Sequence, residues 1–175
     1  MIYNRNIRKI FVYLTRIFWG ERLQDKVELF RNFCLLIIYK LLKKIFKITF
    51  NPYHYLLSDI KLKTPFGTFF CRKKSTGLRY ISPLYESEII KLFTSYNISK
   101  KGGIFIDIGA NIGLYSILLA KKWKVIAIEP NPETFKILLK NIELNKLKSR
   151  IMPFNVAIFS KNDVLTLFAD ETSPG

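Results

Sequence analysis

The chain has 175 residues, of which 29 are Lys or Arg and 13 are Asp or Glu, giving a formal net charge of +16. This length is sufficient to bury a hydrophobic core. Its two cysteines, Cys34 and Cys71, lie far apart and lack metal-ligand spacing, so free thiols in a reducing compartment are expected and a metal site is not.

Residues 1–50 are strongly basic, with eleven Lys or Arg against three acidic residues. Segments 5–20 and 27–50 have helical patterns in which basic and apolar positions are interleaved. The most apolar run, 33–42, is too short to span a bilayer and begins too late for a secretory signal. Three alternatives remain for this arm: an anchor on an anionic membrane, a helical cap with solvated lysines, or a nucleic-acid arm. The dense aliphatic and aromatic content disfavours the last.

Residues 59–82 predict a small antiparallel β unit. Apolar and polar residues alternate over 60–64, and the turn at 65–67 leads into a returning segment. A further loop then precedes residues 78–81. A helix is expected to begin near Glu86, which either faces a ligand or lies only at the helix N-terminus.

Residues 104–135 carry most of the functional information. A β-branched and aromatic run predicts a strand buried on both faces of a parallel sheet. A turn containing glycine, a helix and a second strand then follow. The expected elements are strands at 104–108, 124–129 and 150–156, helices at 114–122 and from Pro132 with Asn131 as its N-cap, and an antiparallel strand at 164–168.

The turn has the chemistry of a nucleoside-cofactor site, because ligands bind outside the carboxyl ends of parallel strands. Gly109 and Gly113 permit close backbone approach, and Glu129 can accept hydrogen bonds from ribose hydroxyls. Asn111 stands where a nicotinamide fingerprint requires glycine, which favours S-adenosylmethionine. Asp107 can then hold the cationic methionine end.

Segments 107–113 and 128–132 resemble the FkbM-type S-adenosylmethionine-dependent methyltransferases, with a likeness over roughly residues 60–170. The resemblance implies a Rossmann-like class I methyltransferase fold. It also implies O-methylation of a small molecule or glycan. No catalytic base is assigned. The expected cofactor-binding residues are Asp107, Gly109, Ala110, Asn111, Gly113, Tyr115, Glu129, Pro130, Asn131 and Ala157.

The sequence predicts a basic helical arm at 1–58 and a methyltransferase-type α/β domain at 59–175, with a β hairpin at 59–82 and a cofactor core at 100–170. Few residues follow the cofactor segment, so the fold is expected to be incomplete at its C-terminus. One alternative is an inactive fragment or a membrane-associated module that at most binds the cofactor. Another is a nicotinamide-dependent enzyme. The expected location is the cytoplasm, with peripheral contact of residues 1–50 on the inner face of the membrane as an alternative, and nucleic acid is not expected as a partner.

Overall fold

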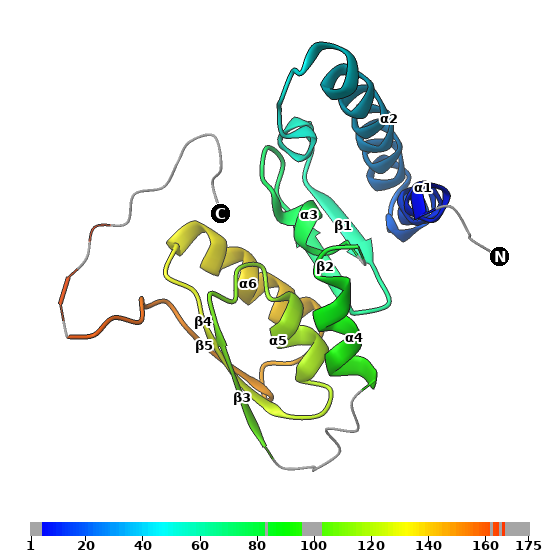
Figure 1. Cartoon of the computed structure of the whole chain (residues 1–175). Helices are drawn as coiled ribbons and strands as arrows, with labels where there is room; N and C mark the ends of the chain where they lie inside the picture. The colour runs from blue at the N-terminus through cyan, green and yellow to red at the C-terminus, as the bar shows by residue number, and fades with distance from the viewer. Residues whose placement is uncertain (1–4, 83, 96–102, 162, 165, 167–175) are drawn as a thin grey trace. The chain divides into compact units, whose positions relative to one another are not determined.

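The computed structural model describes residues 5–82, 84–95, 103–161, 163, 164 and 166. The chain divides into two compact units, Met1–Thr64 with Phe70–Tyr85 and Pro65–Phe69 with Glu86–Gly175. Figure 1 labels the elements of both. The predicted domain boundary between residues 58 and 59 stays a prediction.

The N-terminal part of the chain is mainly helical, as its apolar periodicity predicts. Its elements are α1 (Arg5–Thr15), η1 (Arg16–Trp19), α2 (Leu23–Phe46), η2 (Pro52–Tyr55), β1 (Ile60–Lys63), β2 (Thr68–Cys71) and α3 (Gly77–Tyr80). Helix α2 begins where Asp25 Oδ2 accepts a hydrogen bond from the Arg22 amide at 2.8 Å. It ends at Lys47, whose φ of 55° is left-handed.

The predicted β unit is present only in part. Strands β1 and β2 form a two-stranded sheet, but residues 77–80 form the short helix α3. The Arg79 amide bonds to the Thr76 carbonyl, and the Ser82 amide bonds to the Arg79 carbonyl. Leu78 and Ile81 are both fully buried and lie three residues apart. This is a helical spacing, which explains why the segment does not continue as a strand.

The second unit contains a parallel sheet that confirms the predicted α/β fold class. Its elements are α4 (Ser87–Ser95), β3 (Ile104–Ile108), α5 (Leu114–Leu119), β4 (Lys124–Ile128), α6 (Pro132–Leu144) and β5 (Ile151–Phe154). The strand order is β3-β4-β5, and both pairings are parallel. The predicted strand at 164–168 lies largely outside the described residues.

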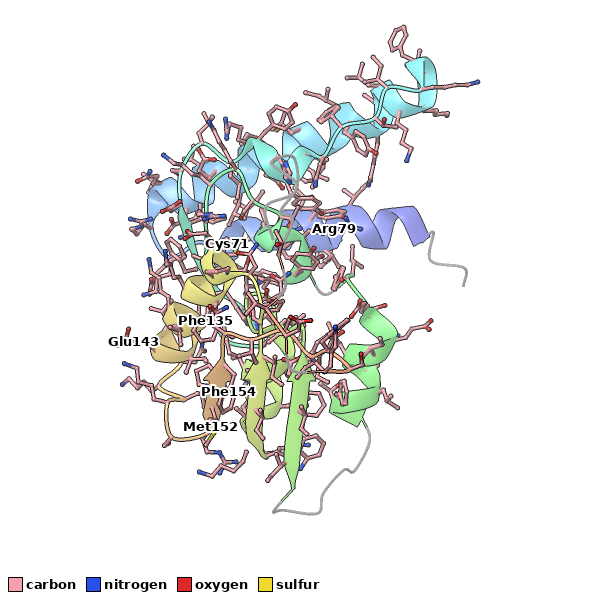
Figure 2. All side chains as sticks on the ribbon, turned by 90° about the vertical axis from the view of Figure 1, so that its left-hand side faces the viewer. Cys71, Arg79, Phe135, Glu143, Met152 and Phe154 are labelled. Carbon is pink, nitrogen blue, oxygen red and sulfur yellow. The ribbon has the colours of Figure 1, made fainter. Side chains whose placement is uncertain are left out.

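The described helices cover one face of this sheet. Val125, Ala127 and Ile151 are buried on the helix side. On the opposite face, the exposed fractions are 67% for Ile104, 55% for Ile106, 64% for Ile108, 59% for Met152 and 41% for Phe154. Figure 2 labels Met152 and Phe154 on β5.

The prediction that the first strand is buried on both faces is therefore wrong for the described part of the chain. The three strands lie in the sheet in the same order as in the chain, β3-β4-β5, and each strand connects to the next through one helix. Right-handed crossovers in one direction place both helices, α5 and α6, on the same face.

The start of α6 follows the sequence prediction closely. The Asn131 side chain accepts hydrogen bonds from the amides of Glu133 and Thr134 at 2.9 and 3.2 Å, and Pro132 occupies the first turn. Two otherwise unpaired amides of the helix are thereby satisfied.

We expect Asn131→Ala to lower the free energy of unfolding by about 1 kcal/mol, because the cap is lost. Asn131→Ser keeps an acceptor at the same place and is the matched control, expected to lose much less. Urea unfolding followed by circular dichroism measures both. Equal losses for the two variants would contradict the capping role.

Candidate functional site

The loop between β3 and α5 has an unusual backbone. Gly109, Asn111 and Gly113 have φ values of 77°, 50° and 91°, all in the left-handed region. Glycine reaches this region without strain, and asparagine tolerates it better than most residues. The turn chemistry read from the sequence therefore describes the loop correctly.

Every backbone amide from Gly109 to Gly113 already has an acceptor inside the protein. In chain order the acceptors are the Ile128 carbonyl twice, Glu129 Oε2, Asn111 Oδ1 and the Ala110 carbonyl, at 2.9, 2.9, 2.8, 2.7 and 2.8 Å. Phosphate-binding loops instead direct several unpaired amides at the ligand. The geometry therefore favours a ligand without phosphate groups at this loop.

Glu129 joins the two loops that border the site. Its Oε2 accepts from the Asn111 amide at 2.8 Å, and its Oε1 accepts from the Asn131 amide at 2.9 Å. The residue is 7% exposed. Each carboxylate oxygen has capacity for a second hydrogen bond, which a ribose hydroxyl can donate.

The two glycines of the loop have different surroundings. A Cβ at Gly109 would have no atom within 4 Å, so the backbone there borders open space. A Cβ at Gly113 would lie 2.6 Å from Leu138 Cδ1, a side chain of α6. Gly109 thus leaves room for a ligand, whereas Gly113 allows the two helices to pack closely.

Asp107 lies near the end of β3, on the helix-covered face of the sheet. It is 7% exposed, and its Oδ2 accepts a hydrogen bond from Ser116 Oγ at 2.6 Å. Burial raises the pKa of this carboxyl, and the hydrogen bonds from Ser116 offset part of that rise. A cationic ligand group nearby would favour the ionised form.

Tyr115 is directed toward α4 in this structure. Its hydroxyl forms a short hydrogen bond with the Glu86 carboxylate, and its ring contacts Phe93 at a centroid distance of 5.8 Å. Glu86 has a φ of 43°, which is rare for a residue other than glycine. Contact of Tyr115 with the cofactor stays a prediction.

The other predicted residues follow the second and third strands. Pro130 is half-buried beside Glu129, and Ala157 is exposed beyond β5. Asn155 also belongs to this group, although the sequence analysis gave it no role. Its Nδ2 donates to the carbonyls of Glu129 and Pro130 at 2.8 and 3.0 Å, which fixes the loop after β4.

Asn141 is a further supporting residue that sequence reasoning missed. It is fully buried in α6, and its Nδ2 donates to the Ile112 carbonyl at 2.9 Å. Asn145, one turn later, bonds both backbone groups of Thr68 at 2.6 and 2.8 Å. Two asparagines spaced four apart on an apolar helix face are the sequence signal for this role.

Among the described residues, neither a metal-binding cluster nor a membrane-spanning helix is found. No cluster of His, Cys, Asp or Glu within them could hold a metal ion. None of the helices described here is both long and apolar enough to cross a bilayer.

Residues 85–167 match the family model described as the TRM5/TYW2 methyltransferase domain. A tRNA (guanine(37)-N(1))-methyltransferase of Batrachochytrium dendrobatidis is 40% identical over 73 residues, which are 41% of this chain and 14% of that protein. A tRNA(Phe) (4-demethylwyosine(37)-C(7)) aminocarboxypropyltransferase of Pyrococcus horikoshii is 43% identical over 61 residues, 34% of this chain and 22% of that protein. The chain thus spans only about a seventh to a fifth of these relatives.

Two solved structures of Methanocaldococcus jannaschii proteins are also similar. Its tRNA m1G37 methyltransferase gives a TM-score of 0.45 at 26% identity, over 55% of this chain and 29% of that chain. Its TYW2 in complex with AdoMet gives 0.43 at 28% identity, over 57% of this chain and 43% of that chain.

The matched family model agrees with the predicted methyltransferase fold class and corrects the family assignment. The resemblance to the FkbM family is wrong, because the matching family model is that of the TRM5/TYW2 methyltransferase domain. The small-molecule or glycan acceptor, which rested on that resemblance, loses its support. The expectation that nucleic acid is not a partner is also wrong, since several curated relatives are named for tRNA. It had been judged from the N-terminal arm alone, whereas the similarity lies in residues 85–167.

The two glycines provide a matched pair of variants. We expect Gly113→Ala to lower the free energy of unfolding by about 2 to 4 kcal/mol, because its methyl group would overlap Leu138 at a left-handed position. An alanine Cβ at position 109 would meet no neighbouring atom. Gly109→Ala should therefore lower the free energy of unfolding by only about 1 to 2 kcal/mol, through backbone strain alone. Urea unfolding of both variants tests the difference, and a larger loss at Gly109 would contradict this structure.

The raised pKa of Asp107 predicts that the free energy of unfolding depends on pH. Folding favours the protonated form of the Asp107 carboxyl. The contribution of this group to folding stability is therefore fully present below the ordinary carboxyl pKa and is lost as pH rises through the raised pKa. We therefore expect the stability of the native chain, relative to Asp107→Asn, to fall as pH rises from acid to neutral. Urea unfolding of both proteins across this range measures the difference. A relative stability that increased with pH would contradict the burial argument.

Proposed function

We propose that residues 85–167 bind S-adenosylmethionine and that the chain takes part in methyl transfer to tRNA. One observation carries the cofactor assignment: a left-handed loop whose amides are all satisfied, and which borders open space at Gly109. Such a loop suits a nucleoside without phosphates. The match to a methyltransferase family model supports the same assignment.

In this proposal each acidic side chain has one task. Glu129 accepts the ribose hydroxyls while its two backbone hydrogen bonds hold it in place. Asp107 attracts the cationic methionine end, which lowers the energy of its buried ionised form. Gly109 lets the ligand approach the backbone without a side chain between them.

The acceptor assignment rests on the named relatives and on charge. Several curated proteins similar to this chain are named as tRNA (guanine(37)-N(1))-methyltransferases. The net charge of +16 suits a polyanionic substrate. A surface groove beside α6 is lined by Lys136, Lys140, Lys148 and Glu143, among others, and exposed pairs join Lys136 to Glu133 and Lys148 to Glu143 at 2.6 and 2.7 Å. In this proposal the lysines exchange these exposed pairs for contacts with phosphates.

For guanine N1 the reaction balances as an in-line displacement. The carbon–sulfur bond of the sulfonium breaks, the carbon–nitrogen bond forms, and sulfur retains the electron pair in S-adenosylhomocysteine. The N1 proton passes to a base. The residues described above bind and orient the cofactor, and their contribution is positional.

Aminocarboxypropyl transfer is a second candidate, because one relative with that name is 43% identical over its matched region. The same cofactor would then break a different carbon–sulfur bond and leave methylthioadenosine. The cofactor site would be unchanged, so the released nucleoside distinguishes the two reactions.

We expect the chain to bind S-adenosylhomocysteine at one site in a calorimetric titration and to bind a nicotinamide dinucleotide much more weakly. Glu129→Gln should weaken S-adenosylhomocysteine binding at least about tenfold, because an amide cannot accept from both backbone groups and the ribose. Glu133→Gln changes a nearby exposed acid on α6 and is the matched control.

Separate incubations with S-adenosylmethionine and either unmodified tRNA or tRNA that carries 4-demethylwyosine at position 37, followed by chromatography of the released nucleoside, test the transfer itself. S-adenosylhomocysteine with methylated tRNA supports methyl transfer, and methylthioadenosine supports the second candidate. Tight dinucleotide binding with no affinity for S-adenosylhomocysteine would refute the cofactor assignment.

A further inference from the structure

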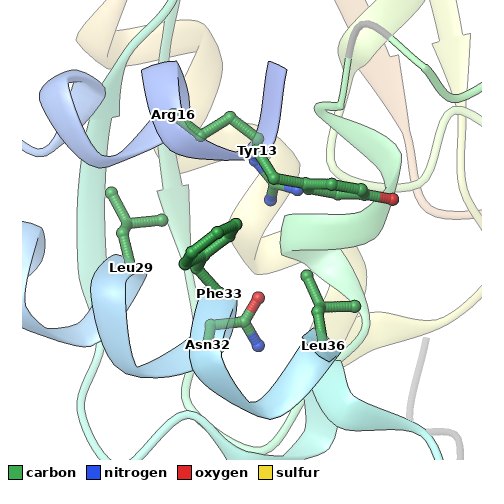
Figure 3. Close-up of a pocket in the computed structure, with 6 residues that line it drawn as sticks. All are labelled: Tyr13, Arg16, Leu29, Asn32, Phe33 and Leu36. Carbon is green, nitrogen blue, oxygen red and sulfur yellow. The ribbon is translucent and has the colours of Figure 1, made fainter. Parts of the chain in front are cut away.

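Helix α2 has two apolar faces, and only one of them is covered. Figure 3 shows the inner face, where Leu29, Asn32 and Leu36 point toward Tyr13 and Arg16. Leu29 is 4% exposed, Asn32 3% and Leu36 6%. This face therefore accounts for the packing of α2 in its own unit.

The outer face has a continuous row of large apolar side chains, here called the outer stripe. Its members are Leu23, Val27, Phe30, Ile37, Leu41 and Ile45, with exposed fractions of 79%, 56%, 55%, 41%, 54% and 65%. Their spacings of three, four or seven residues place them on one side of the helix. At 100° per residue this side lies about 150° from the inner face. An exposed apolar strip along 24 residues is expected to contact a partner.

The charges around the outer stripe all have one sign. No Asp or Glu occurs between Glu28 and Asp59. The two acids of α2, Asp25 and Glu28, are buried, and Arg22 and Arg31 pair with them at 2.8 and 2.9 Å. Two lysines border the outer stripe, the exposed Lys44 and the half-buried Lys26, each about 60° from its centre. Lys40 and Lys43 instead lie over the rings of Tyr13 and Tyr39.

The positive charges beside the outer stripe favour one of three possible partners: a second copy of the chain, RNA or an anionic bilayer. A second copy packed along the same stripe would bring lysines against lysines, which destabilises a helix pair. RNA would neutralise the lysines but would leave the aliphatic row without a partner. The surface of an anionic bilayer satisfies both, because apolar side chains enter the headgroup boundary while lysines contact the headgroups.

We propose that α2 lies flat on an anionic bilayer, with the outer stripe inserted and Lys26 and Lys44 on the headgroups. The helix does not cross the bilayer, in agreement with its apolar content, which is too low for a span. This surface belongs to the first unit alone. It requires neither the cofactor nor tRNA, so it stands independently of the proposed reaction.

Sedimentation of the full chain with phosphatidylcholine vesicles, with and without phosphatidylglycerol, tests this proposal. We expect binding to the anionic vesicles and little to the neutral ones. The double variants Phe30→Ser/Leu41→Ser and Lys26→Gln/Lys44→Gln should each weaken binding at least about tenfold. Met152→Ser removes an exposed apolar side chain from the other unit and should leave binding unchanged.

Circular dichroism establishes that each variant is folded, and sedimentation equilibrium reports self-association. Absence of binding to anionic vesicles, or binding that the stripe variant leaves unchanged, overturns the proposal. A native dimer that the stripe variant dissociates would assign the stripe to a second copy instead. Binding lost in the lysine variant but retained in the stripe variant also overturns it, because the attraction would then be purely electrostatic.

Discussion

The bridging of two loops by Glu129 is the interaction on which the rest of the site depends. One carboxylate oxygen holds the Asn111 amide in the first loop, and the other holds the Asn131 amide at the start of α6. Both loops follow adjacent parallel strands, and they would otherwise be joined only through the sheet. A buried carboxylate with two backbone donors is satisfied without a cation beside it. The acid expected to bind a ligand therefore also builds the site that the ligand would enter.

Asparagine side chains stabilise the loops around this bridge. Asn111 occupies a left-handed position and bonds its neighbour's amide, and Asn131 caps α6. Asn141 donates to the Ile112 carbonyl of the first loop, and Asn155 donates to the Glu129 and Pro130 carbonyls of the second. Each amide group satisfies backbone atoms that turns leave unpaired. The loops are consequently shaped before any ligand binds, which reduces the conformational entropy lost on binding.

Much of this arrangement could be predicted from the sequence, because it depends on local signals. Strand patterns at 104–108 and 124–129, the left-handed loop and the Asn131 cap each have a recognisable residue pattern, and the structure contains all of them. Contacts between distant segments could not be predicted in the same way. The Tyr115–Glu86 bond has no signal at a fixed spacing, and the pair of asparagines on α6 indicates a polar role without identifying the Ile112 carbonyl as the partner of Asn141. The exposed face of the sheet was missed because continuous apolar runs suggest two buried faces whether or not both are covered.

The incorrect family assignment has a related physical origin. The residues on which the FkbM resemblance rested are those that shape the backbone. Gly113 permits helix packing, Asn131 caps a helix, and Glu129 joins two loops. These requirements come from placing a nucleoside at the end of a parallel sheet, so they recur whatever molecule receives the transferred group. Such a motif therefore identifies the cofactor class more securely than the acceptor. Acceptor choice depends on surfaces beyond the loop, and here the available signals are charge and similarity along the whole of residues 85–167.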